Sequence, residues 1–203
     1  MKLYHSPLSP FVRKVSVLLH ELDRTDQVEV ETVVTTALDS SDRLIAANPL
    51  GKIPALARTD GPTLYDSRVI CAYLNDRFGG ALYPGGAQRW QTLTLEATAD
   101  GLMEAAVAMA YEVRLRPEAE RSPAWIEAQW AKAARAITAL NARWMSHLAG
   151  PLDMGQIAVA CALGYVDFRH DARNWRRDNP ALADWFATFE SRPSMQATRP
   201  VQV

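Results

Sequence analysis

The residue pattern of this chain changes once, at a glycine-rich stretch near residue 80. Gly79 and Gly80 are soon followed by Gly85 and Gly86, the densest glycines in the sequence. Before this stretch, alternating and helical spacings of apolar residues follow one another, whereas after it only helical spacing is found. The sequence therefore predicts a small α/β domain over residues 1–78, a linker over residues 79–88 and an all-helical domain over residues 89–203.

The predicted element order of the first domain is β-α-β-α-β-β-α. Strands are expected over residues 2–5, 28–34, 54–57 and 63–65, with a turn at residues 60–62 joining the last two as a hairpin. Helices are expected over residues 10–22, 41–47 and 67–78. The second domain should contain helices over residues 88–114 and 123–148, one starting at residue 153, and one from residue 180 to residue 192. Asp153 and Gln156 have the spacing of a reciprocal capping box at the third of these helices.

Charge and composition exclude several classes of protein. The sequence has 22 basic and 23 acidic residues, and the two signs balance on each side of Gly79, with 9 basic and 10 acidic residues before it and 13 of each after it. It therefore lacks the positive surplus of a phosphate-binding nucleic-acid protein. Its longest apolar run, residues 157–166, is far shorter than the roughly 20 residues of a membrane-spanning helix. Cys71 and Cys161 are too few and too far apart for a disulfide framework or a metal site. We therefore expect a cytoplasmic protein with reduced thiols that binds no metal, membrane or nucleic acid.

The loop between the first strand and the first helix displays Ser9. Ser9 followed by Pro10 is typical of a helix N-cap followed by proline at the first helical position. The same hydroxyl could instead stabilise a bound thiolate, because a helix N-terminus favours negative charge. Lowering a thiol pKa by ~2 units requires about 2.7 kcal/mol, most of which one charge-assisted hydrogen bond and a helix terminus can supply. These residues alone leave both interpretations open.

Residues 48–56 form a second loop, which leads into the third strand and contains two prolines. A cis Ile53-Pro54 bond would turn the N–H and C=O of Ile53 outward, where they could pair with a ligand's amide. Only ~5–6% of X–Pro bonds are cis, so the spacing alone does not establish one. The neighbouring Lys52 is, by itself, typical of a solvated surface charge.

Asp66 and Ser67 begin the last helix of the first domain, where they are typical of a capping pair. They could also bind a ligand, because the hydroxyl and N–H of Ser67 suit a carboxylate and Asp66 suits an ammonium group. Together, the two residues would match the α-amino acid end of a small molecule.

Taken in this order, the three segments resemble the N-terminal domain of the glutathione transferases, which has a thioredoxin-like fold. The run Ser-Pro-Phe-Val-Arg-Lys-Val at residues 9–15 is similar to the start of serine-type members. Residues 48–54 resemble the family's cis-proline loop, and Asp66-Ser67 resembles its acidic-Ser pair. Beyond the linker, the resemblance continues through residues 99–101, 157–165 and 167–169, and it is closest to a bacterial subgroup whose substrates are uncharacterised.

The resemblance implies a role for each of these residues. Ser9 would be the catalytic residue, which donates a hydrogen bond to the glutathione sulfur and favours its thiolate. The backbone of Ile53, before cis Pro54, would pair with the cysteinyl moiety of glutathione. The other implied glutathione ligands are Lys52 near the glycyl carboxylate, Asp66 and Ser67 at the γ-glutamyl group, and Asp100 of a partner subunit at the same ammonium.

Some assignments have alternatives in the sequence itself. Ser6, on the same loop, or Tyr4, on the first strand, could replace Ser9 as the group that activates the thiol. His5 is interpreted as structural or exposed. Candidates for lining a second-substrate pocket are Leu8, Met103, Val107 and Tyr111, although methionine at helical spacing is more often part of a core.

The resemblance implies conjugation of glutathione to a small hydrophobic electrophile, by a homodimer with a role in detoxification. Ser9-Pro10-Phe11-Val12 replaces the Cys-x-x-Cys of thioredoxins, which excludes dithiol–disulfide exchange at this position. Two alternatives remain open in the sequence. One is a non-catalytic binding or regulatory protein that has kept the transferase fold, like the stringent-starvation proteins, and the other is a glutathione-dependent isomerase or reductase.

Overall fold

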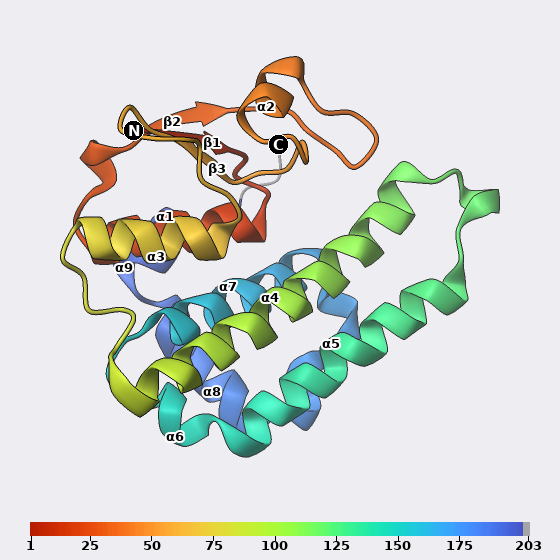
Figure 1. The fold of residues 1–203 in the computed structure, drawn as a ribbon. Helices are drawn as coiled ribbons and strands as arrows, with labels where there is room; N and C mark the ends of the chain where they lie inside the picture. The colour runs from red at the N-terminus through yellow and green to blue at the C-terminus, as the bar shows by residue number, and fades with distance from the viewer. Residues whose placement is uncertain (201–203) are drawn as a thin grey trace. The chain divides into compact units, whose positions relative to one another are not determined.

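The computed structural model describes residues 1–200, which form two compact units (Figure 1). The first unit comprises Met1–Pro84 together with residues 193–200, and the second comprises Gly85–Arg192. The first is a small α/β unit and the second is helical, which confirms the predicted fold class. The linker ends earlier than residue 88, because Gly85 is already the N-cap of the first helix of the second unit.

The sheet of the first unit has three strands in the order β2-β1-β3. They are β1 (Lys2–His5), β2 (Glu29–Thr32) and β3 (Ala55–Ala57). The central strand β1 pairs parallel to β2 and antiparallel to β3, so Leu3 lies between Val30 and Leu56. Leu3 and Leu56 are completely buried, and these contacts form the centre of the unit's core.

Helices cover both faces of this sheet (Figure 1). α1 (Pro10–Glu21) and α3 (Ser67–Arg77) pack against each other on one face, and α2 (Asp42–Ala47) lies on the other. A short 3₁₀ turn, Thr25–Gln27, precedes β2. α1 is amphipathic and buries Val12, Val15 and Leu18 completely, in agreement with the helical spacing of its apolar residues.

The predicted fourth strand over residues 63–65 is not formed. Leu56 and Leu64 exchange two backbone hydrogen bonds of 2.9 Å, but this bridge stands alone. Asp66 already caps α3 two residues after Leu64, so the chain leaves the sheet before a ladder can extend.

The end of the chain packs with the first unit, whereas the sequence assigned it to the helical domain. α9 (Pro193–Ala197) contacts α1, and the buried Arg13 donates from Nη2 to the carbonyl of Met195 at 3.1 Å. Ser194 also hydrogen-bonds Glu21. These contacts join residues more than 170 positions apart, which no local spacing can indicate.

The second unit contains five α-helices among the described residues: α4 (Gly86–Leu115), α5 (Pro123–Arg143), α6 (Met145–Leu148), α7 (Met154–His170) and α8 (Pro180–Glu190). Short 3₁₀ turns lie at Glu118–Glu120, Asp171–Arg173 and Trp175–Asp178. The helix predicted over residues 123–148 is interrupted at Trp144, where α5 ends and α6 begins. α7 is buried at every residue from 154 to 166 and forms the core of the unit. Within residues 1–200, no helix is long and apolar enough to cross a membrane.

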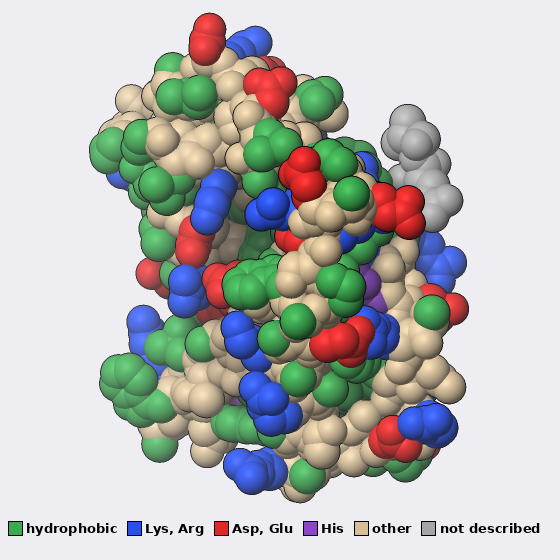
Figure 2. All heavy atoms as spheres, turned by 90° about the vertical axis from the view of Figure 1, so that its right-hand side faces the viewer, with side chains coloured by type: hydrophobic (Ala, Val, Ile, Leu, Met, Phe, Trp, Pro, Cys, Tyr) green, Lys and Arg blue, Asp and Glu red, His purple; other side chains and the backbone are tan. Residues whose placement is uncertain are grey.

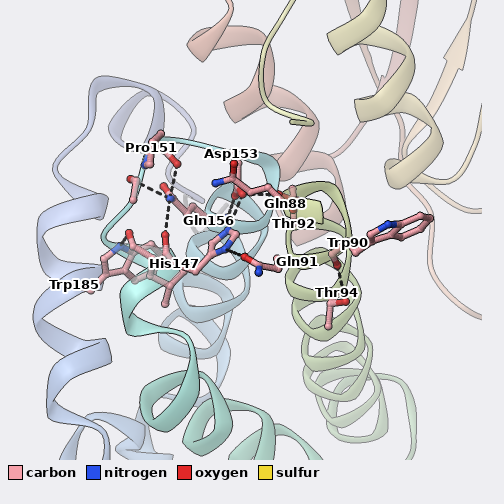
Figure 3. A network of polar contacts seen from close by, with 12 residues as sticks. Gln88, Trp90, Gln91, Thr92, Thr94, His147, Pro151, Asp153, Gln156 and Trp185 are labelled. Atoms are coloured by element: carbon pink, nitrogen blue, oxygen red, sulfur yellow. Dashed lines mark hydrogen bonds and ion pairs between the residues drawn. The ribbon is translucent and has the colours of Figure 1, made fainter. Parts of the chain in front are cut away.

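Asp153 anchors the start of α7 through a polar network (Figure 3). One carboxylate oxygen, Oδ1, accepts from the Gln156 N–H at 3.0 Å, which is the N-cap. The other, Oδ2, accepts from the Thr92 hydroxyl at 2.6 Å and contacts Nε2 of His147 at 2.7 Å. The capping box is therefore half formed, because the Gln156 amide donates to the carbonyls of His147, Gly150 and Pro151 rather than back to its cap.

We predict that Asp153→Ala lowers the free energy of unfolding by about 3 kcal/mol, since it removes a cap and leaves buried donors without an acceptor. Urea denaturation followed by circular dichroism measures this loss. Asp184→Ala, at an exposed aspartate on α8, is the matched control and should change stability by less than about 0.5 kcal/mol. A loss below about 1 kcal/mol in Asp153→Ala would contradict the anchoring role.

Candidate functional site

Two of the three junctions singled out in the sequence meet at one end of the sheet. β1 ends at His5 and continues into the loop that carries Ser9. β3 runs antiparallel to β1 and pairs Ala55 with Tyr4, so the same register brings Pro54 beside His5. The start of α1 and the loop before Pro54 are therefore neighbours at this end.

The third junction reaches the same end. Leu64 bridges Leu56, which pairs in turn with Leu3, and the chain then runs in the direction of β1. Two residues further on, Asp66 caps α3. The charge of the Lys14 ammonium on α1 also lowers the pKa of the Asp66 carboxyl. This effect agrees with a position of Asp66 near the start of α1. The structure thus brings the three predicted segments together.

Ser9 is the N-cap of α1, as predicted. Its hydroxyl oxygen accepts from the Val12 N–H at 3.3 Å, and its backbone is extended, with φ −88° and ψ 123°. Its own N–H donates to the Ser6 carbonyl at 3.1 Å, which closes the turn before the helix. Accepting a hydrogen bond leaves the hydroxyl hydrogen available for donation, so a half-buried donor stands at a helix N-terminus.

The two alternative activating groups are less well placed. The Ser6 hydroxyl oxygen accepts from the Leu8 N–H at 3.4 Å, within the loop and before the helix begins. Tyr4 is only 8% exposed and packs with Leu44 and Ala55 in the core beside α2. The geometry therefore favours Ser9 among the three.

The Ile53–Pro54 peptide bond is cis. Asn48, which is 1% exposed, organises the loop before it: Nδ2 donates to the Lys52 carbonyl at 2.8 Å and Oδ1 accepts from the Leu50 N–H at 3.1 Å. One buried side chain thus bridges both ends of the loop. Sequence reasoning used Asn48 only to locate the loop and missed this positioning role.

Gly51 supplies the left-handed turn of the same loop. Its φ is +62°, and a Cβ built there would lie 2.7 Å from the Ser40 hydroxyl oxygen. Its carbonyl accepts from Ser40 at 3.0 Å and from Thr35 at 3.2 Å. Both the conformation and the space at this position therefore require glycine.

Asp66 and Ser67 begin α3, and the Tyr65–Asp66 peptide bond is also cis. The Asp66 carboxylate accepts from the Arg68 N–H at 3.0 Å and from its guanidinium at 3.1 Å. Burial raises the pKa of the Asp66 carboxyl, but Arg68 and the more distant Lys14 outweigh this effect and hold the pKa below its usual range. Asp66 is therefore ionised at neutral pH and still exposed, while Ser67 is buried.

The remaining predicted residues fall into two groups. In the first unit, Lys52 is exposed, and Leu8 and Ile53 are half-buried. In the second, Asp100 is 4% exposed and Met103 is completely buried, while Val107 and Tyr111 are half-buried on α4. The roles assigned to these residues, including a shared second-substrate pocket, stay predictions.

The sequence analysis placed His5 beside the site and interpreted it as structural or exposed. It is half-buried, and burial lowers the pKa of its imidazole, so it is neutral near pH 7. Its position beside Pro54 follows from the antiparallel register. Spacing along the sequence could not show this, because the register joins residues almost 50 positions apart.

Within residues 1–200, no group of three or more histidine, cysteine or acidic side chains could hold a metal ion. Cys71 and Cys161 are buried, and they form no disulfide with each other. On the face of the molecule drawn in Figure 2, basic and acidic side chains are interspersed with hydrophobic ones.

A thioredoxin-like unit with a cis-proline loop, followed by a helical unit, is the architecture of glutathione transferases. Residues 3–82 match the family model described as glutathione S-transferase, N-terminal domain, and residues 123–188 match the one described as glutathione S-transferase, C-terminal domain. The chain belongs to the glutathione S-transferase family.

Similar proteins span the whole chain. A glutathione transferase family member from Pseudomonas fluorescens Pf-5, solved with bound glutathione, is 44% identical over 99% of both chains, with a TM-score of 0.96. A structure of a family member from the same organism with bound S-(propanoic acid)-glutathione is 44% identical over 100% of both chains, with a TM-score of 0.92. The uncharacterized GST-like protein YibF of Escherichia coli K12 is 32% identical over 98% of each chain.

We predict that Asn48→Ala destabilises the protein by about 2 kcal/mol, because it leaves the Leu50 N–H and the Lys52 carbonyl of the loop without their partner. Asn48→Asp keeps an acceptor for Leu50 and should lose less. Urea denaturation of the two variants measures the difference. Equal stability of Asn48→Ala and the wild type would refute the bridging role.

Proposed function

We propose that this protein is a serine-type glutathione transferase that binds glutathione and activates its thiol through Ser9. The observation that carries the proposal is the meeting of three features at one end of the sheet: the N-terminus of α1, the cis Ile53–Pro54 peptide and the Asp66–Ser67 helix cap. Each feature offers groups that match a different part of glutathione.

The Ser9 hydroxyl donates a hydrogen bond to the sulfur, while its oxygen still accepts from the Val12 N–H. Ile53 pairs its backbone N–H and C=O with the cysteinyl moiety, which the cis bond to Pro54 supports. Asp66 accepts from the γ-glutamyl ammonium and Ser67 binds the adjacent carboxylate. Lys52, which is exposed, lies near the glycyl carboxylate.

The chemistry is nucleophilic substitution or addition by the thiolate. On binding, the thiol proton leaves to water, and the thiolate then forms a bond to an electrophilic carbon of the second substrate. In a substitution, the leaving group departs from that carbon with the electron pair of its bond. In an addition to a double bond, the π electrons move to the far atom, which takes up a proton from water. The Ser9 hydroxyl and the N-terminus of α1 stabilise the thiolate. Holding both reactants in position lowers the entropic part of the activation free energy. The bound glutathione and S-(propanoic acid)-glutathione of the Pseudomonas fluorescens structures support this proposal, because they represent a substrate and a conjugate.

The wider proposal follows the family resemblance. It includes a small hydrophobic electrophile, contacts from Leu8, Met103, Val107 and Tyr111, a cytoplasmic homodimer and a role in detoxification. Asp100 of one subunit would assist the γ-glutamyl ammonium of the other.

We predict that Ser9→Ala removes the thiolate absorbance of bound glutathione near neutral pH and lowers the turnover number about 100-fold, the equivalent of about 2.7 kcal/mol. Titration with glutathione, followed at the ultraviolet absorbance of the thiolate, measures the effect. Ser6→Ala is the matched control and should keep the signal. A signal unchanged in Ser9→Ala but lost in Ser6→Ala would transfer the role to Ser6.

We predict that Ser67→Ala weakens glutathione binding about tenfold, as expected for the loss of a hydrogen bond to a charged group, and leaves the pKa of the bound thiol unchanged. Calorimetry with S-methylglutathione measures the affinity without thiol ionisation. Unchanged affinity would reject the γ-glutamyl assignment. Binding without a thiolate signal in the wild type would favour a non-catalytic glutathione-binding protein.

A further inference from the structure

His5 is the last residue of β1, and the sheet fixes the direction of its side chain. Tyr4 packs against Leu44 of α2, and successive side chains of a strand point to opposite faces. His5 therefore points to the other face, which α1 and α3 cover (Figure 1). Its carbonyl accepts from the Val33 N–H at 2.9 Å, so pairing with the neighbouring chain holds the His5 backbone at the end of the strand. The imidazole thus lies on the α1 side of the sheet, at the end where α1 begins.

Two parts of the proposed glutathione site lie next to this imidazole. The antiparallel pairing of β1 with β3 places Pro54, and with it the backbone of Ile53, beside His5. Along the chain, the Ser9 N–H donates to the Ser6 carbonyl at 3.1 Å, and a turn of this kind keeps its first and last Cα atoms within about 7 Å. Ser9 therefore stays close to the end of β1. His5, Ser9 and Pro54 all belong to the first unit.

The two ring nitrogens of His5 differ in their surroundings. Nδ1 is buried and has no hydrogen-bond partner within the described part of the chain. Nδ1 lies next to the carbon that attaches the ring, whereas Nε2 lies at the tip of the ring. Because the residue as a whole is only half-buried, Nε2 is the nitrogen that a bound molecule can reach. His5 therefore presents one polar atom to the site.

The protonation of His5 determines what that atom can do. Burial lowers the pKa of the imidazole, so near pH 7 the ring is neutral and carries a single N–H. On Nδ1, this hydrogen would be a buried donor without an acceptor, whereas on Nε2 it can be donated to a bound molecule. Since burial also disfavours the imidazolium, His5 is poorly suited to hold a proton taken from a thiol. The ring is therefore a neutral hydrogen-bond donor.

We propose that His5 is a catalytic residue that donates a second hydrogen bond to the glutathione sulfur, beside the bond from Ser9. A cysteinyl moiety paired with the Ile53 backbone lies beside the end of β1, and its side chain must extend toward the start of α1 to meet Ser9. The sulfur then lies within reach of both donors. A hydrogen bond to a charged acceptor favours the charged form, so His5 stabilises the thiolate. The thiol proton still leaves to water, and His5 keeps its own. The inference rests on the proposed function and adds a residue to it.

The test measures the pKa of the bound thiol, from the ultraviolet absorbance of the thiolate at saturating glutathione over a range of pH. His5→Phe keeps a ring and removes both nitrogens. We expect it to raise the pKa of the bound thiol by about one unit, which is a tenfold fall in the ratio of thiolate to thiol. His20→Phe, at an exposed histidine near the end of α1, is the matched control and should leave this pKa unchanged.

Two amide variants separate donation by Nε2 from a structural role of the ring. The amide nitrogen of His5→Gln reaches the position of Nε2, whereas that of His5→Asn stops near the position of Nδ1. We expect the glutamine to restore most of the thiolate signal and the asparagine to behave like the phenylalanine. Calorimetry with S-methylglutathione, which has no thiolate, should show less than about a twofold change in affinity in every variant, because a thioether sulfur is a weak acceptor. The comparison of the two amides tests the proposal even if His5→Phe fails to fold.

The possible outcomes separate this inference from the proposed function. The same bound-thiol pKa in the wild type, His5→Phe and His5→Asn would overturn the role of His5 and leave the transferase function standing. Equal shifts in His5→Gln and His5→Asn, with weaker binding of S-methylglutathione in both, would also overturn it, because they would show a structural role. If the wild type binds S-methylglutathione but gives no thiolate signal with glutathione, the proposed function falls and the second donor falls with it.

Discussion

The pairing of β1 with a parallel strand on one side and an antiparallel strand on the other is the constraint on which the first unit depends. The parallel partner β2 requires a crossover, which α1 provides, so α1 must start at the end where β1 stops. The antiparallel partner β3 must begin at that same end, which brings Pro54 beside His5. A shift of one residue in either pairing would exchange the buried faces of Leu3 and Tyr4, so the core fixes the register and the register fixes the site.

In the second unit, the orientation of α7 must be fixed without a polar face, because this helix is buried on all sides over most of its length. With every residue from 154 to 166 buried, apolar packing alone would tolerate rotation or sliding of α7 against α4. Polar contacts at the two ends of the helix remove that freedom: Asp153 binds Thr92 at the start, and His170 contacts the Ala106 carbonyl at the end.

The sequence predicted the elements whose signals are local. The Ser9 cap, the start of α5 at Pro123 and the Asp153 cap were all confirmed, since each depends on residues within one turn of the helix. The return of α9 to α1 and the position of His5 beside Pro54 were missed, because both depend on contacts between distant parts of the chain. The strand expected over residues 63–65 failed for a related reason. Alternation indicated an extended segment but could not show that the Asp66 cap would end its pairing.

The two interpretations of Ser9 that the sequence left open are compatible, because they use different parts of one hydroxyl group. Capping uses an oxygen lone pair, which accepts from the Val12 N–H, whereas thiolate stabilisation uses the hydroxyl hydrogen. The cap also restrains the serine side chain at the helix N-terminus, so no further group is needed to aim the donor. A helix cap contributes about 1 kcal/mol to stability, and a hydrogen bond to a charged sulfur is of similar or greater size. The loss of Ser9 should therefore affect folding and thiol ionisation through separate bonds. The effect on thiol ionisation requires bound glutathione, whereas the effect on folding does not. The pKa of the bound thiol, rather than the stability of the protein, therefore reports on catalysis.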